Sequence, residues 1–116
     1  MDESKRMAVL IIRKYLHDLE RRNTYYWNSA EFTQAHYSKI AAIKLIEFIE
    51  SDSPLSAIDI VDRFRDKMNR YSLMNDFNSL MFSIQCDAST YILDKLIFYK
   101  ERRINQNGQN KIHTVH

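Results

Sequence analysis

The sequence predicts an all-α fold, a four-helix bundle, and three observations indicate it. The chain of 116 residues holds one Gly and one Pro, whereas tight hairpins and other turns with positive φ draw on glycine. Residues 80–99 form a helical pattern whose apolar side chains spread over roughly 220° of the circumference. Elsewhere, apolar residues recur at three- and four-residue steps between short polar connections. We expect one helical domain over 1–103 and a disordered, polar tail over 104–116.

The first helix is predicted over about residues 3–22. Apolar residues recur at helical spacing from Ala8 to Leu19. Arg21 and Arg22 in the last turn suit the negative end of the helix dipole.

The second helix is predicted over about residues 29–51, because Asn28 and Glu31 have the spacing of a capping box. Its apolar side chains form two adjoining rows, so we expect one broad side to be buried. The rows consist of Tyr37, Ala41, Leu45 and Phe48, and of Phe32, Ile40, Ile43 and Ile46.

The third helix is predicted over about residues 54–71. Ser53 is a favoured N-cap residue, and Pro54 suits the first helical position.

The fourth helix, about residues 79–103, has the widest apolar arc, and we expect the other helices to cover it on more than one side. Gln85 and Ser89 point into that arc and would need hydrogen-bond partners if buried. Asp87 and Asp94 lie on the narrow polar strip that remains.

Charge and cysteine content exclude several classes of protein. The net charge is +2 and no block of five like charges occurs, so the strong basic footprint of many nucleic-acid binders is missing. The single cysteine, Cys86, excludes a disulfide framework and favours the cytoplasm. Neither a signal peptide nor an apolar stretch of membrane-spanning length is present, so we expect no membrane partner.

No pattern of catalytic or metal-binding residues stands out. The four histidines include no HExxH and no ExxH pair of the kind that di-iron bundles use. Asp87 and Asp94 lack a nucleophile or an oxyanion donor beside them, and Cys86 lacks an activating partner. We therefore predict a protein that is not an enzyme and has no metal or cofactor.

The best candidate for function is the cluster of three aromatic residues after the first helix. Stacked aromatic rings beside guanidinium groups bind single-stranded bases, and Trp, Tyr and Arg also dominate protein-binding hot spots. The alternative is that the rings only plug the end of the bundle. With the polar strip of the fourth helix added, the candidate partner-binding residues are Arg21, Arg22, Tyr25, Tyr26, Trp27, Asp87 and Asp94.

The segment MFSIQCDASTYILDKLI, residues 81–97, resembles a C-terminal signature of uncharacterised small helical proteins carried on prophage, plasmids and conjugative elements of Gram-positive bacteria. The preceding FRDKMNRY, residues 64–71, is similar to the segment that stands before that signature. The resemblance implies an all-α fold and a mobile-element setting, and it implies no activity. Cys86 departs from the signature, which has an aromatic residue there. The matching residues are Met81, Phe82, Ser83, Asp87, Ala88, Ile92, Leu93 and Asp94.

Together these observations predict a non-catalytic interaction protein that binds and modulates a protein partner. In a mobile element, an anti-CRISPR-like inhibitor or an antitoxin-like regulator would fit this description. The alternative is a small nucleic-acid-binding regulator that uses the basic and aromatic residues from Arg21 to Trp27. A homodimer also stays open, because a second copy would cover a fourth helix that is apolar over so wide an arc.

Overall fold

Four α-helices form the fold, and the predicted all-α class is confirmed. The computed structural model describes the backbone of residues 1–23 and 29–115, and the side chains of 1–22 and 29–103. No strand occurs in those parts of the chain. The helices are α1 (Glu3–Asn23), α2 (Ser29–Glu50), α3 (Ala57–Met74) and α4 (Ser79–Val115).

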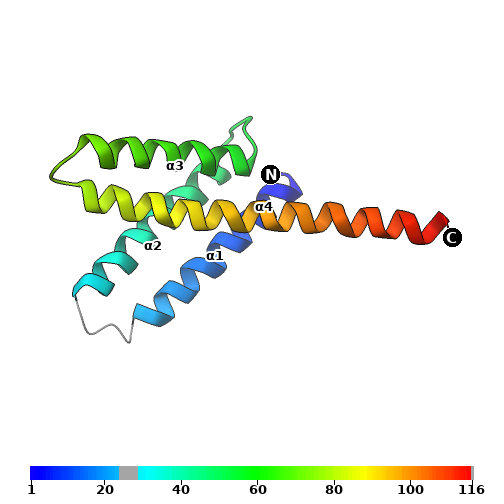
Figure 1. Ribbon diagram of the computed structural model, residues 1–116, viewed down its shortest axis with the longest axis horizontal. Coiled ribbons are helices and arrows are strands. Elements are labelled where there is room, and N and C mark those ends of the chain that lie inside the picture. Colours follow the sequence, from blue (N-terminus) through cyan, green and yellow to red (C-terminus); the bar gives the residue numbers. More distant parts are fainter. Residues whose placement is uncertain (24–28, 116) are drawn as a thin grey trace.

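The helices pack as two antiparallel pairs that lie across each other. Figure 1 shows α1 beside α2 as one pair and α3 beside α4 as the other. Short connections make the neighbours in each pair antiparallel, as in other helical hairpins. The first part of α4 crosses both helices of the first pair, which places it in contact with all three other helices.

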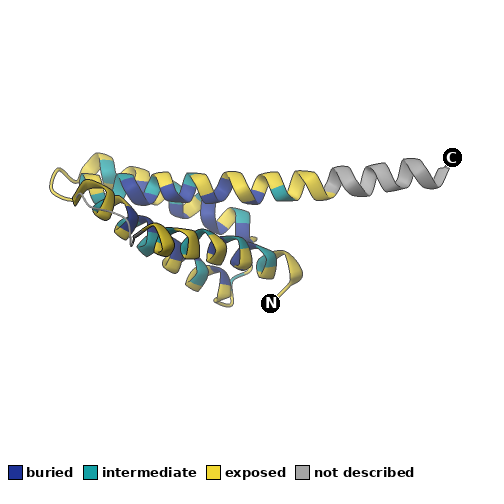
Figure 2. Ribbon diagram, turned by 90° about the horizontal axis from the view of Figure 1, so that it is seen from below, coloured by how far each residue is buried: buried dark blue, intermediate teal, exposed yellow. Residues whose placement is uncertain are grey.

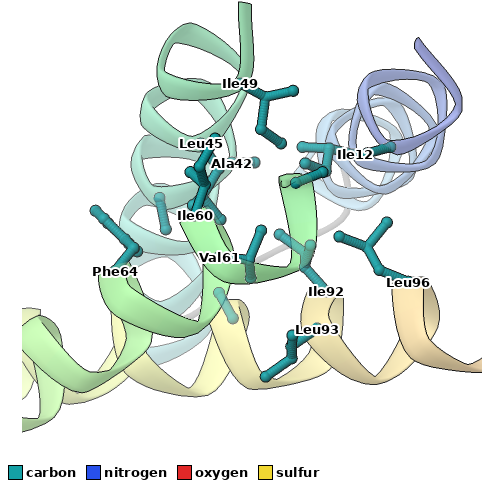
Figure 3. Close-up of a cluster of buried hydrophobic side chains, with 14 of the residues drawn as sticks. Ile12, Ala42, Leu45, Ile49, Ile60, Val61, Phe64, Ile92, Leu93 and Leu96 are labelled. Atoms are coloured by element: carbon teal, nitrogen blue, oxygen red, sulfur yellow. The ribbon is translucent and has the colours of Figure 1, made fainter. Parts of the chain in front are cut away.

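All four helices contribute to one apolar core. Ile12 of α1, Leu45 of α2, Val61 of α3 and Ile92 of α4 are each at most 1% exposed. Figure 3 shows these side chains converging from their separate helices on a common centre. The bundle is therefore held by contacts between elements far apart in the sequence.

The prediction that α4 is covered on more than one side holds only in part. Its buried residues lie mainly along one side of the helix and its exposed residues along the other, as the colours of the ribbon in Figure 2 show. Leu80, Tyr91 and Phe98 in this part of α4 are 65%, 48% and 63% exposed. In a two-layer arrangement α3 flanks α4 and the first pair covers one face, so the remaining face stays open.

The two apolar rows predicted for α2 match its buried side only in part, since Ala41 and Leu45 are fully buried as predicted. Phe32, Ile43 and Phe48 are exposed by 53%, 44% and 47%. The buried side instead consists largely of small residues, which allow neighbouring helices to approach closely. These buried residues are Ala35, Ser38, Ala41, Ala42, Leu45 and Ile49.

The predicted start of α3 at residue 54 is wrong. Ser56 is the N-cap, with φ −68° and ψ 160°, and its hydroxyl accepts a hydrogen bond from the backbone N–H of Asp59. Ser53 instead accepts from the backbone N–H of Leu55 at 3.2 Å and closes a local turn before the helix. Two serines three residues apart offered equivalent caps, and the acidic residue at the third helical position favours the second one.

The observed ends of α1, α2 and α3 lie close to the predicted ends. Helices α1 and α2 end within one residue of the predicted positions, whereas α3 continues three residues beyond its predicted end. The predicted helix over 79–103 is present in α4, whose helical backbone runs on to Val115. The side chains of residues 104–115, and the whole of residue 116, lie outside the described part of the chain, where the tail was predicted.

Candidate interaction surfaces

Two of the predicted site residues come together in a hollow between α1, α2 and α4. Arg22, at the end of α1, and Asp87, on α4, both line this hollow, which has a volume of about 490 Å³. Asp94 lies one heptad further along α4 and is exposed, but it is not part of the lining. Arg21 is exposed on α1. We call this region the polar hollow.

The three predicted aromatic residues fall outside the described part of the chain. Tyr25, Tyr26 and Trp27 belong to the connection between α1 and α2, over residues 24–28. Whether they form a binding surface or plug the end of the bundle therefore stays a prediction.

Carboxylates outnumber cations among the charged residues that line the polar hollow. Asp18, Glu31 and Asp87 face one guanidinium group, that of Arg22, and the lining contains no histidine or cysteine. Tyr15 and Tyr91 close one side, with their ring centroids 5.2 Å apart. The arrangement suits recognition of polar or cationic groups.

The remaining chemically reactive side chains are placed as structural residues. Cys86 is partly buried against the core, and burial, followed by the nearby negative charge of Asp87, raises the pKa of its thiol above the usual value. A thiol with a raised pKa stays protonated at neutral pH and is a poor nucleophile. His36 stacks on Phe32, with ring centroids 6.2 Å apart. Within the described residues, no group of three or more His, Cys, Asp or Glu side chains is placed to hold a metal ion.

A second concave surface, which the sequence did not reveal, runs between α1 and α4. We call it the α1–α4 groove; its volume is about 320 Å³, and it shares Tyr15, Asp18 and Tyr91 with the polar hollow. Three cationic side chains, Lys14, Lys95 and Arg102, belong to its lining. Its other residues are Ile11, Ile92, Phe98 and Tyr99.

The most exposed apolar side chains gather at the turn between α3 and α4. Leu73, Met74, Phe77 and Leu80 are exposed by 78%, 79%, 99% and 65%. They lie within eight residues of one another at the end of the hairpin shown in Figure 1. We call these four residues the tip patch. Helical spacing did not reveal the patch, because residues 72–78 fall between the predicted third and fourth helices.

Local contacts hold the turn that carries the tip patch. The Ser79 hydroxyl donates a hydrogen bond of 2.9 Å to the backbone oxygen of Ser72, across the turn. One turn further into the hairpin, the rings of Tyr71 and Phe82 meet edge to face, with centroids 5.2 Å apart. The patch is thus presented on an ordered turn, which lowers the entropy lost when a partner binds.

Neither the apolar character of the helices nor comparison with known proteins assigns the chain to a more specific class of protein. Within the described part of the chain, no helix combines the length and the apolar character needed to cross a membrane. Comparison with protein families, curated proteins and solved structures finds no match. The resemblance to small helical proteins of mobile elements therefore stays a prediction.

Proposed function

We propose that the chain is a non-catalytic interaction protein that binds a partner protein through the tip patch. The observation that carries the proposal is the exposure of four large apolar side chains within one turn, the highest being 99% at Phe77. Single exposed apolar residues are common on soluble proteins, but groups of them mark interaction sites. Phe and Met are also enriched in the buried centres of protein interfaces.

Burial of the tip patch against a partner would favour binding. Full burial of one Leu, Met or Phe side chain is worth about 1.5–3 kcal/mol, and the patch has four such side chains. Part of that energy is lost to the translational and rotational entropy of association, and the ordered turn lowers the additional cost of ordering the backbone. The residues beside the patch, Asn75, Asp76 and Asn78, are polar and exposed, so they suit the rim of an interface.

The finer role is proposed from the sequence resemblance alone. In a mobile element, a small binding protein without catalytic groups acts by occupying a surface of its target, as an anti-CRISPR-like inhibitor or an antitoxin-like regulator does. A cytoplasmic location, favoured by the single cysteine, belongs to the same proposal. The neighbouring genes test it: phage, plasmid or conjugation genes would support the role, and a conserved chromosomal operon would contradict it.

The second candidate function is nucleic-acid binding through Arg21, Arg22 and the aromatic residues that follow them. Exposure of both arginines at the end of α1 supports it. Binding of this kind weakens steeply as salt is added, because counterions are released from phosphates. A shift of single-stranded or duplex oligonucleotides at about 50 mM salt that disappears at about 200 mM would support it. The absence of any shift at the lower concentration would exclude it.

The tip-patch proposal is tested by capturing a partner with the full chain and two matched variants. Phe77→Ser removes the most exposed apolar side chain, whereas Leu10→Ser removes one that is 55% exposed on α1, away from the tip. We expect a stoichiometric partner, recovered from a lysate of the organism that encodes the chain, to be lost with Phe77→Ser and kept with Leu10→Ser. Equal recovery with both variants, or no stoichiometric partner at all, would contradict the proposal.

Light scattering decides whether the partner is a second copy. A mass of twice 13.9 kDa that returns to the single value in Phe77→Ser would make the tip patch a homodimer interface. If the unsubstituted chain and Phe77→Ser both have the mass of one copy, the partner of the tip patch is a different protein.

A further inference from the structure

The α1–α4 groove presents a regular alternation of rings and cations that the proposed function does not use. Along α4, Tyr91, Lys95, Phe98 and Arg102 follow at steps of four, three and four residues. This spacing places all four side chains on one face of the helix, and all four line the groove. Phe98 is 63% exposed there, although it lies beside a well-packed core.

Helix α1 supplies the opposite wall with the same helical spacing. Ile11, Lys14, Tyr15 and Asp18 lie at steps of three, one and three residues and line the groove together. The floor is apolar, because Ile92 lies there with 1% exposure. An apolar trough between two helices with charged residues along its rim is the geometry that receives an amphipathic helix.

The cations of the groove are available to a ligand. Lys14, Lys95 and Arg102 are exposed and form no ion pair within the described residues, although Lys95 lies over the ring of Tyr91, at 5.3 Å from its centroid. Nearby cations do find partners: Arg13 pairs with Glu50 at 3.0 Å. Among the described residues of the lining, Asp18 supplies the one carboxylate. The groove therefore has an excess of positive charge around apolar side chains.

We infer that the α1–α4 groove binds an acidic amphipathic helix of a partner protein. The apolar side of such a helix packs on Phe98 and the floor of the groove, and its carboxylates meet Lys14, Lys95 and Arg102. The groove volume of about 320 Å³ is at the small end of ligand sites, so it receives a few anchoring side chains rather than a whole cofactor. Complementary charge at the rim then selects the partner and speeds its association.

The surroundings of the groove favour a peptide over a nucleic acid. The rings of Tyr15 and Tyr91 contact each other, so they are not free platforms on which bases could stack.

The inference deepens the proposed function, since it too requires a protein partner, but it concerns a different surface. Variants separate the two. Phe77→Ser would abolish binding at the tip patch and leave the groove intact, whereas Lys95→Glu would do the reverse.

The test selects random 16-residue peptides, displayed on phage, against the full chain and then titrates the enriched peptides by fluorescence anisotropy. We expect enriched peptides to be net acidic, with apolar residues at i, i+3 or i+4, and i+7. Lys95→Glu and Arg102→Glu should each weaken their binding about tenfold, because each reverses a charge at the rim. Lys44→Glu, which reverses an exposed cation on α2 outside the groove, should leave binding unchanged.

Three outcomes would overturn the inference. One is that no peptide, or only peptides without an acidic excess, is enriched. Another is that Lys44→Glu weakens binding as much as Lys95→Glu, which would indicate a general charge effect. The third is that a single-stranded oligonucleotide of 20 thymidines displaces the peptides and binds more tightly, which would assign the groove to nucleic acid. Because all three substituted side chains are exposed, circular dichroism should show unchanged folding in each variant.

Discussion

Gln85 is the residue at which the core departs most clearly from good packing rules. It is 1% exposed, and its amide nitrogen donates a long hydrogen bond of 3.4 Å to the backbone oxygen of Met81. Its amide oxygen is buried and has no hydrogen-bond partner among the residues that the structure describes. Ser89, also fully buried, avoids this problem because its hydroxyl donates to the backbone oxygen of Gln85 at 2.7 Å. The sequence identified both residues as needing partners, and only the serine finds a good one.

Replacing Gln85 by Met should stabilise the protein by about 1–2 kcal/mol, because the substitution removes an unsatisfied buried oxygen and keeps a long, flexible side chain of similar shape. Urea denaturation followed by circular dichroism measures the change. The matched control is Gln34→Met on the exposed side of α2, which should change stability by less than about 0.5 kcal/mol. A loss of stability in Gln85→Met would show that the amide oxygen has a partner, such as a bound water.

At the residue scale, sequence reasoning found some of the concave surface and missed the rest for a physical reason. It identified Arg22 and Asp87, which the fold brings together in the polar hollow. It missed Lys95 and Phe98, because a ring or a cation on a helix becomes part of a groove only when a neighbouring helix supplies the other wall. That neighbour, α1, is about eighty residues away in the sequence, so no local sequence pattern predicts the contact.

At the scale of the element, the start of α3 shows how two good local signals compete. Ser53 and Ser56 are both acceptable N-caps, and Pro54 favours the first one. The structure chooses Ser56, whose hydroxyl accepts from the N–H of Asp59. A tertiary contact supports this choice: Lys5 of α1 donates a hydrogen bond of 2.7 Å to the backbone oxygen of Ser53, which holds residue 53 in the connection outside the helix.

Substituting Ser56 by Ala should therefore destabilise the protein by about 1 kcal/mol, the usual cost of losing an N-cap. Ser53→Ala should cost less than half as much, because it removes only a bond within the preceding turn and leaves the backbone oxygen that Lys5 contacts. Thermal denaturation of the two variants under identical conditions checks the difference. If Ser53→Ala were the more costly substitution, the cap would lie at residue 53 as the sequence predicted.

Helices α2 and α4 show why their existence could be predicted and their buried faces could not. Helical spacing of apolar residues is a local property, so all four helices were found. Which apolar residues become buried depends on where neighbours pack. In α2 the small residues Ala42 and Ser38 lie inside and the large Phe48 lies outside, because close approach of helices requires small side chains.

At the scale of the whole molecule, the arrangement separates the stabilising core from the surfaces available for binding. The tip patch lies at the turn of the second helical pair, and the α1–α4 groove lies where the two pairs meet. Neither surface is lined mainly by the fully buried side chains of the core. Substitutions at exposed positions on either surface should therefore change binding without unfolding the protein.

The core itself can be tested at the point where all four helices converge. Ile92 is 1% exposed and packs among side chains from the other three helices (Figure 3). Ile92→Ala should therefore cost about 2–5 kcal/mol, the sum of lost burial and the cavity left behind. Ile97→Ala, five residues further along α4 and 37% exposed, should cost much less because water already reaches that side chain. Urea denaturation with a single transition in each variant would measure both values. Equal costs at the two positions would mean that α4 is not packed into a core shared by the four helices.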